Sequence, residues 1–411
     1  MNNANEPRAR GRQFYFNPGP TNIPDSVLSA MSRPAQDFLT DEFKMVLRRT
    51  HANLKRALHC KQHLLMYGAN GHSAWEAALA NVFSVGDKVL ILESGYFSYH
   101  WTKMARDLGL EVETLWANWR TGVAVPEVSE RLAADTAHEI KGVLVVHNET
   151  ATGLVHPLKE IRDAIDSAKH PALFLADTIS SFASMDFDFD AWGIDVAVGG
   201  SQKGLMMITG LSFTAISDRA MEISKSGGLR RSFFDWRAMQ LVEPQRFPGT
   251  SPVHLIYGLD EALRLLQDEG MDNVIARHVR FGGAVRAAVR HWGDGAANAA
   301  TISWDSLDGS IDGIQLLCTD PARLSDSVTA VFVPDGYDAN VMRRIALDRY
   351  NLSLGQGLGP LAGRVFRIGH LGDMNEPMIL GALATIELAL KTSGIPHKSG
   401  GIDAAVAVLA A

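Results

Sequence analysis

The sequence predicts an α/β protein with two lobes: a large three-layer domain around a mostly parallel central sheet, and a smaller C-terminal α+β domain. Two observations favour this class. Between about residues 62 and 217, short uninterrupted apolar runs alternate with segments of helical periodicity. Uninterrupted apolarity over a few residues is typical of strands buried on both faces, as in parallel sheets covered by helices. The length of 411 residues also favours more than one core.

The elements of the large lobe follow in chain order. Strands are predicted at residues 88–92, 142–146, 172–176, 196–198 and 211–216. Helices are predicted at residues 72–83, 101–108 and 158–168, the first with Trp75, Ala78, Leu79 and Val82 on one apolar face. This β-α alternation predicts right-handed crossovers between neighbouring strands.

The smaller lobe begins near residue 270, where the pattern changes. Its predicted helices lie at 274–292, 339–347 and 378–391, and its predicted strands at 313–318 and 328–333. Proline at positions 18, 20 and 24 predicts an extended arm over the first residues. We therefore divide the chain into an N-terminal arm (1–30), a large domain (31–270), a small domain (271–395) and a tail (396–411), which is expected to be a frayed helix.

Composition and charge disfavour several classes of function. The net charge is −7 without a basic block, so neither nucleic acid nor an anionic membrane is expected as a partner. No apolar run is long enough to span a bilayer, and the polar N-terminal residues do not resemble a secretory signal. The two cysteines are too few for a disulfide scaffold or a cysteine zinc site. We expect a cytoplasmic protein with no metal site.

Three segments carry candidate chemistry. Lys203 follows an apolar strand and two glycines in the run DVAVGGSQKG at 195–204, and Asp177 ends another predicted strand. Asn70 and His72 stand at a glycine turn where a helix begins, and free amides there attract anions. Each segment alone has a structural alternative, such as a solvated lysine or a helix cap. Together they supply the amine, the acid and the phosphate cradle that pyridoxal 5′-phosphate (PLP) requires.

With these residues, the chain resembles the class V, fold-type I PLP-dependent enzymes, in the branch of the alanine-, serine- and aspartate–glyoxylate aminotransferases. The resemblance spans about residues 14–393. It is carried by PGPTNIP at 18–24, GHSAWEA at 71–77, HNETATG at 147–153, Asp177 with Ser180 and Ser181, GSQKG at 200–204 and FRIGHLG at 366–372.

The resemblance implies a role for each matching residue. Lys203 corresponds to the lysine that forms the Schiff base with PLP, and Asp177 to the partner of the pyridine nitrogen. The remaining implied cofactor contacts are Asn70, Gly71, His72 and Gln202 at the phosphate, Phe97 on the ring face, Thr150 near the ring oxygen, and Thr250. Arg367 is implied to bind the substrate carboxylate, with Pro20 and Thr21 beside it. In relatives a neighbouring subunit lends the residue at Thr250, which implies a homodimer with a shared active site.

The implied reaction is transamination from serine, alanine or aspartate to an oxo acid, with glyoxylate preferred by resemblance. Two departures bear on it. Phe247 stands where many relatives carry a tyrosine that contacts the phosphate. The run QDFLT at 36–40 replaces an Asp-His-Arg-Ser-like run. If the latter lines the substrate entrance, Phe38 and Leu39 make it more apolar and disfavour a strongly acidic donor.

Three alternatives stay open at this stage. Pyridoxamine–pyruvate or ureidoglycine–glyoxylate transamination would use the same catalytic groups. A PLP lyase on the same fold, such as a cysteine desulfurase, needs a reactive thiol, whereas Cys60 and Cys318 lie in patterns typical of buried residues. A non-catalytic module would be expected to lack Lys203, Asp177 or Arg367, and all three are present.

Overall fold

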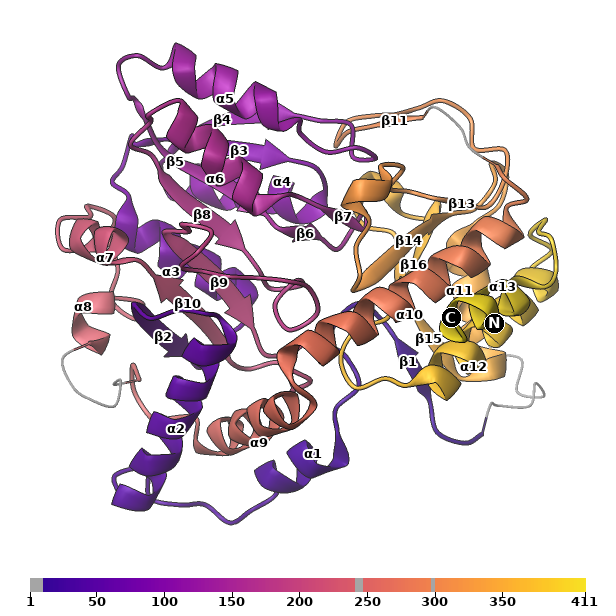
Figure 1. Cartoon of the computed structure of the whole chain (residues 1–411), viewed down its shortest axis with the longest axis horizontal. Helices are drawn as coiled ribbons and strands as arrows, with labels where there is room; N and C mark the ends of the chain where they lie inside the picture. The colour runs from indigo at the N-terminus through magenta and orange to yellow at the C-terminus, as the bar shows by residue number, and fades with distance from the viewer. Residues whose placement is uncertain (1–9, 241–246, 297–299) are drawn as a thin grey trace.

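The computed structural model describes residues 10–240, 247–296 and 300–411, and it contains two main sheets (Figure 1). The larger sheet has seven strands. Their spatial order is β2 (His63–Tyr67), β10 (Ser212–Ile216), β9 (Val196–Gly200), β8 (Leu173–Asp177), β5 (Ile140–Val146), β3 (Lys88–Glu93) and β4 (Glu111–Trp116). β10 is antiparallel to both its neighbours, and the other pairs are parallel. The sheet is therefore mostly parallel, as predicted.

Two hydrophobic cores cover the two faces of this sheet. Along β5, Val143 and Val145 belong to one core, whereas Leu144 and Val146 belong to the other. The first core is closed by α2 (Asp41–Ala57), α5 (Val125–Ala134), α6 (Leu158–Ser167) and α9 (Val253–Glu269), and the second by α3 (Gly71–Val82), α4 (Tyr96–Asp107), α7 (Asp218–Ser224) and α8 (Trp236–Met239). Because successive side chains on a strand alternate between faces, burial on both faces accounts for the uninterrupted apolar runs. The predicted three-layer architecture is confirmed.

The second sheet has five strands and lies beside the first. Their order is β1 (Phe14–Phe16), β15 (Leu352–Gln356), β16 (Val365–Gly369), β14 (Val328–Phe332) and β13 (Gln315–Leu316). Its core includes residues of α10 (Met271–Trp292), α11 (Ala339–Tyr350), α12 (Glu376–Thr392) and α13 (Gly401–Leu409). The first strand comes from the N-terminal arm and pairs in parallel with β15. This pairing brings the arm across to the small sheet. The helix α1 (Asp25–Met31) and the strand pairs β6 (Asn148–Glu149) with β7 (Leu154–Val155) and β11 (Thr301–Ile302) with β12 (Leu307–Asp308) complete the described strands and α-helices.

Three expectations need correction. The helix predicted from residue 101 begins at Tyr96, because Ser98 and Glu149 bind the backbone amides at its start. The strand predicted at 313–318 is reduced to the two residues of β13. The terminal helix is not frayed, because Glu387 accepts hydrogen bonds from the N–H groups of Gly400 and Gly401, at 2.9 and 3.0 Å.

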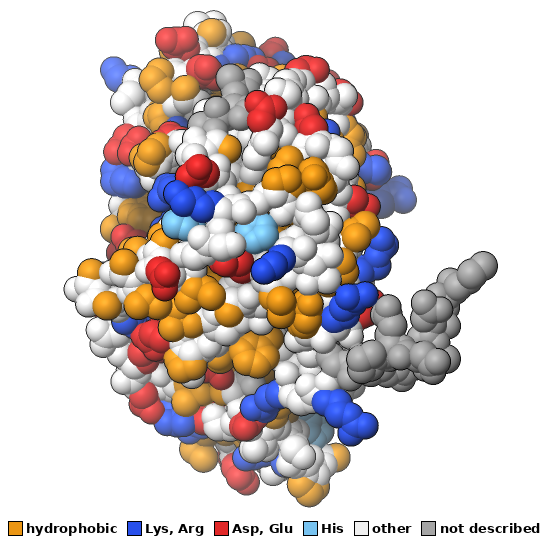
Figure 2. Space-filling view, turned by 90° about the vertical axis from the view of Figure 1, so that its right-hand side faces the viewer, with side chains coloured by type: hydrophobic (Ala, Val, Ile, Leu, Met, Phe, Trp, Pro, Cys, Tyr) orange, Lys and Arg blue, Asp and Glu red, His pale blue; other side chains and the backbone are white. Residues whose placement is uncertain are grey.

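The surface of the small-sheet side carries charges of both signs. Figure 2 shows Lys and Arg interspersed with Asp and Glu there, with hydrophobic side chains scattered among them. Within residues 10–240, 247–296 and 300–411, no helix combines the length and the apolarity needed to cross a bilayer. The same part of the chain contains no cluster of His, Cys, Asp or Glu suited to hold a metal ion.

Candidate active site

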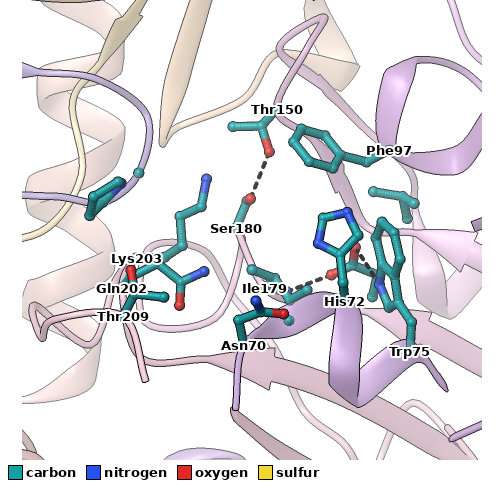
Figure 3. A pocket seen from close by; sticks show the side chains of 15 residues that line it. Asn70, His72, Trp75, Phe97, Thr150, Ile179, Ser180, Gln202, Lys203 and Thr209 are labelled. Carbon is teal, nitrogen blue, oxygen red and sulfur yellow. Dashed lines mark hydrogen bonds between the residues drawn. The ribbon is translucent and has the colours of Figure 1, made fainter. Parts of the chain in front are cut away.

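A cavity of about 240 Å³ lies where the carboxyl ends of β5, β8 and β9 meet the start of α3 and the N-terminal arm. This edge of a parallel sheet is where ligands bind in open α/β folds. Nine of the sequence-predicted site residues line it: Pro20, Asn70, Gly71, His72, Phe97, Thr150, Asp177, Gln202 and Lys203. Figure 3 shows most of them converging on one space from separate elements.

Lys203 follows β9 and enters the cavity from the side of the arm. It is only 8% exposed, and its Nζ donates to the carbonyl oxygen of Pro18. Gly19 packs so closely that a Cβ there would come within 2.4 Å of the lysine Cε. Burial lowers the pKa of Lys203 to about 7, and the Arg367 guanidinium adds to this effect. An amine with this pKa can exchange protons near neutral pH.

Asp177 ends β8 on the other side of the cavity. The carboxylate accepts two hydrogen bonds: Oδ1 from the backbone N–H of Ile179 at 2.8 Å, and Oδ2 from the Trp75 indole N–H at 3.1 Å. Burial raises the pKa of Asp177 to about 7, although the bond from Ile179 opposes that shift. Lys203 across the cavity also lowers the pKa of Asp177, but by less than burial raises it. The site therefore holds a buried acid with oriented donors, ready for a cationic partner.

The start of α3 supplies free amides to the same cavity. Asn70 caps the helix by accepting a hydrogen bond from Ser73, at 3.3 Å. Gly71 has no room for a side chain, because a Cβ would lie 2.3 Å from Cδ1 of Ile179. Helix N-termini stabilise anions, so this corner suits a phosphate. Gln202 lines the same cavity, and its Oε1 is buried without a hydrogen-bond partner among the described residues.

Arg367 reaches the cavity's edge from the small sheet, where it belongs to β16. Its Nε donates to the carbonyl oxygen of Gln356 at 2.7 Å, and its Nη1 to that of Thr150 at 3.0 Å. Thr150 in turn shares a 2.7 Å hydrogen bond with the hydroxyl of Ser180. Burial lowers the pKa of Arg367 to about 10, and Glu149 opposes the shift. The guanidinium is thus fixed next to the cavity without being one of its lining residues.

Two other predicted residues also lie outside the lining. The hydroxyl of Thr21 donates to the carbonyl oxygen of Lys203 at 3.0 Å, so it supports the lysine loop. Thr250 is exposed on the surface of this single chain. The two places where the sequence departs from its relatives, Phe247 and the run at 36–40, also lie outside the lining. Phe247 is buried in the first core, and Phe38 packs against that core. Gln36 accepts a hydrogen bond from Tyr257 instead.

Sequence reasoning missed several lining residues. These are Gly19, Trp75, Val146, Ile179, Ser180 and Thr209. The spacing offered a signal for Trp75, because a residue four positions after Gly71 lies on the same face of a helix. Ser180 stood in a segment that carries the family resemblance, three residues after Asp177. Thr209 gave no signal, because only the tertiary fold brings its loop to the cavity.

A buried lysine and a buried acid share one cavity at the carboxyl edge of a mostly parallel sheet, and solved fold-type I aminotransferases match this fold over nearly the whole chain. A family model described as aminotransferase class-V matches residues 13–290, and the chain belongs to this family. It is a transaminase.

Curated relatives cover nearly the whole chain. The serine–glyoxylate aminotransferase of Hyphomicrobium methylovorum is 43% identical, over 94% of this chain and 91% of its own length. The L-aspartate–glyoxylate aminotransferase of Paracoccus denitrificans is 40% identical, over 95% and 94%. Among solved structures, the ureidoglycine–glyoxylate aminotransferase of Bacillus subtilis has a TM-score of 0.86 at 26% identity, covering 98% of this chain and 99% of its own.

Proposed function

We propose that this chain binds PLP in the cavity and transfers the amino group of serine, alanine or aspartate to an oxo acid, with glyoxylate as the preferred acceptor. The observation that carries the proposal is the placement of Lys203 and Asp177 on one cavity. The named activities of the relatives supply the substrate classes. When bound, PLP supplies an aldehyde that condenses with amines and a ring that withdraws electrons from the substrate α-carbon.

The residues present fit this cofactor chemically. Lys203 offers a buried amine for the aldehyde, and Asp177 offers a buried acid that two hydrogen bonds orient. The amides at the start of α3, with His72 and Gln202, would hold the phosphate. Phe97 would lie against the ring, and Thr150 near its oxygen. These assignments combine the geometry with the family resemblance.

Different side chains of the protein would perform the separate tasks of amino transfer. Arg367 would bind the substrate carboxylate through its guanidinium, which is already oriented by two carbonyl oxygens. Pro20, which lines the cavity, would bound its substrate side, and Thr21 would support the Lys203 loop behind it. Lys203, with a pKa near 7, would accept the proton from the substrate α-carbon at its Nζ. The same Nζ would then donate this proton again to complete the amino transfer. Asp177 would keep the ring nitrogen cationic while this occurs.

A second part of the proposal concerns the assembly and its location. Thr250 is exposed here, which is consistent with its serving the cavity of a second copy in a homodimer. A shared active site of this kind makes the dimer the functional unit. A cytoplasmic location is supported by the two free, buried cysteines, which a reducing compartment would preserve.

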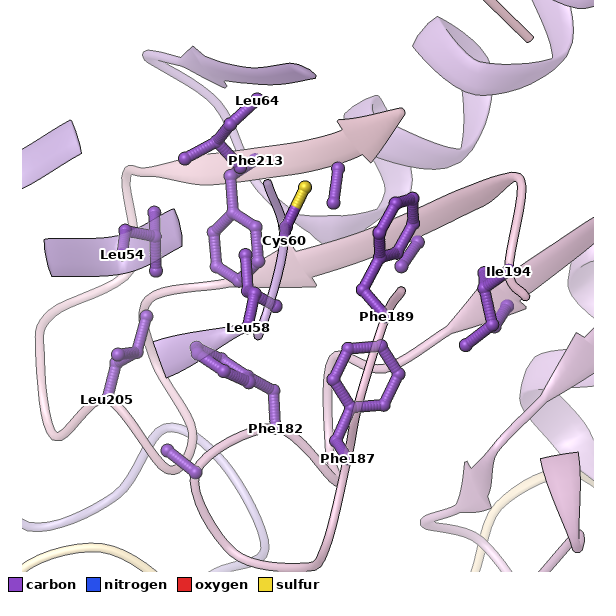
Figure 4. Close-up of a cluster of buried hydrophobic side chains, with 14 of the residues drawn as sticks. Leu54, Leu58, Cys60, Leu64, Phe182, Phe187, Phe189, Ile194, Leu205 and Phe213 are labelled. Carbon is purple, nitrogen blue, oxygen red and sulfur yellow. The ribbon is translucent and has the colours of Figure 1, made fainter. Parts of the chain in front are cut away.

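The buried thiols also weigh against a desulfurase. Cys60 lies among apolar side chains of the first core (Figure 4), and burial raises its pKa to about 11. Burial likewise raises the pKa of Cys318 to about 11. Neither thiol lines the cavity. A transaminase therefore accounts for the site better than a lyase that depends on a thiolate.

A donor-by-acceptor matrix tests the proposal. Serine, alanine, aspartate, ureidoglycine and pyridoxamine would each be paired with glyoxylate and with pyruvate, and the amino product measured. Formation of glycine from glyoxylate with one of the first three donors is expected. Turnover only with pyridoxamine and pyruvate, or only with ureidoglycine, would support those alternatives. Bound PLP without turnover of any pair would overturn the transamination.

A further inference from the structure

Asp177 accepts a hydrogen bond from Trp75. This residue stands in a motif that carries the family resemblance, but the resemblance gave it no role in the site. The indole N–H of Trp75 donates to Oδ2 at 3.1 Å, and the N–H of Ile179 donates to Oδ1 at 2.8 Å. Each carboxylate oxygen thus has one fixed donor. The plane of the carboxylate is set, and both Asp177 and Trp75 line the cavity.

The indole itself is held rigidly. Trp75 is fully buried in α3, and its ring stacks on that of Trp101 in α4, with centroids 5.7 Å apart and planes 16° from parallel. The His72 ring also packs against the indole, with ring centroids 4.5 Å apart (Figure 3). A donor fixed by two neighbouring rings cannot turn away from Asp177 at low cost, so the hydrogen bond is preorganised.

The charged groups around Asp177 and its burial determine whether its carboxylate is ionised, and the bond from the indole acts on the same balance. Lys203 stabilises the ionised carboxylate, Glu149 destabilises it, and burial has the largest effect, raising its pKa to about 7. Among the described residues, His72 packs against the Trp75 ring, and Arg367 acts on Lys203. A hydrogen bond donated to a buried carboxylate stabilises its ionised form, so the indole favours the state that can pair with a cation.

We propose that Trp75 is a positioning residue of the cofactor site, which keeps the Asp177 carboxylate ionised and aimed at the ring nitrogen of PLP. This inference rests on the proposed function. It assigns the positioning of Asp177 to the hydrogen bond from the indole N–H and not to the size of the side chain. Trp119 provides a matched control, because it is equally buried away from the cavity and its Nε1 has no hydrogen-bond partner among the described residues.

The test compares Trp75→Phe with Trp119→Phe in full-length protein, by measuring the PLP dissociation constant between about pH 6 and pH 9. We expect Trp75→Phe to weaken binding about tenfold, since it removes a hydrogen bond to a charged group. The loss should grow toward pH 6, where the unsupported carboxylate becomes protonated. Trp119→Phe should change binding less than about twofold, since no bond is lost. In an Asp177→Asn background, Trp75→Phe should have little further effect.

The outcomes separate the two proposals. If the wild-type protein binds no PLP, the proposed function fails, and this inference fails with it. If the wild type binds PLP and both phenylalanine variants behave alike at every pH, only the role of Trp75 is wrong. If Trp75→Phe does not fold, the test uses PLP-free wild type instead, and the NMR signals of its ¹⁵N-labelled indoles are followed as the pH is changed. The Trp75 signal should then titrate with Asp177 while that of Trp119 does not, and an unmoved Trp75 signal would overturn the inference.

Discussion

The carboxylate of Glu149 accepts a hydrogen bond from the backbone N–H of Phe97, with 3.0 Å between Oε2 and N. It also accepts from the N–H groups of Ser98 at 3.0 Å and Ala151 at 3.1 Å. Gly95 leaves room for it, since a Cβ there would lie 2.3 Å from Cγ of the glutamate. One buried acid therefore joins β6 to the start of α4 and fixes the backbone of the residue proposed to cover the cofactor ring.

Replacing this acid should cost stability. Glu149→Ala leaves two buried N–H groups and one partly buried N–H group without their acceptor, and we expect the free energy of unfolding to fall by about 3 kcal/mol. Urea unfolding of the PLP-free protein measures it. Glu139→Ala is the control, because that glutamate is exposed and forms an ion pair with Lys88 at the surface. Equal stability of the two variants would mean that Glu149 does not hold the start of α4.

The raised pKa of Asp177 predicts a pH-dependent contribution to stability. Its folded-state value of about 7 lies above the roughly 3.9 of an unfolded chain, so between these values the folded protein binds more protons. This contribution is fully present below about pH 4 and is lost as the pH rises through 7. Relative to Asp177→Asn, PLP-free wild type should lose about 2 kcal/mol between pH 5 and pH 8. A difference that stays constant with pH would contradict the burial argument.

Arg367→Lys should damage substrate binding more than cofactor binding. A lysine cannot keep the two carbonyl contacts of Arg367 and also offer a forked pair of donors to a carboxylate. We expect the KM for the amino donor to rise about 30-fold or more, with the PLP dissociation constant nearly unchanged. Arg364→Lys, three residues earlier on the same segment, serves as control. An unchanged KM would remove Arg367 from the substrate site.

Thr250 tests the proposed sharing of the active site. Thr250→Ala should weaken PLP binding about fivefold by removing one hydroxyl from the phosphate, without altering the oligomeric state. Ser251→Ala, the neighbouring hydroxyl, should leave PLP affinity as it is. Size-exclusion chromatography with light scattering reports the assembly, and PLP titration reports the affinity. A monomeric protein with full PLP affinity would rule out the shared site.

Local patterns in the sequence predicted five of the seven strands of the large sheet, but not β2 or β4. Lys203, Asp177 and the start of α3 also stood out from local patterns, whereas most of the other lining residues were named through the family resemblance. Apolar runs such as 88–92 mark strands buried on both faces, and Lys203, Asp177 and Gly71 stand at the ends of predicted elements. The arm's pairing with β15 escaped prediction, since Phe14 and Leu352 meet only in the fold. The contact between Trp75 and Asp177 joins residues 102 positions apart, and periodicity showed Trp75 only as a core residue.

The proposal that Lys203 binds PLP covalently is tested most directly by locating the bond between protein and cofactor. PLP-loaded protein would be reduced with borohydride, digested, and its peptides examined by mass spectrometry. The account predicts a pyridoxyl phosphate group on Nζ of Lys203, and its loss, together with at least a hundredfold drop in turnover, in Lys203→Ala. A pyridoxyl phosphate group found on a different lysine, or Lys203→Ala with full turnover, would contradict it.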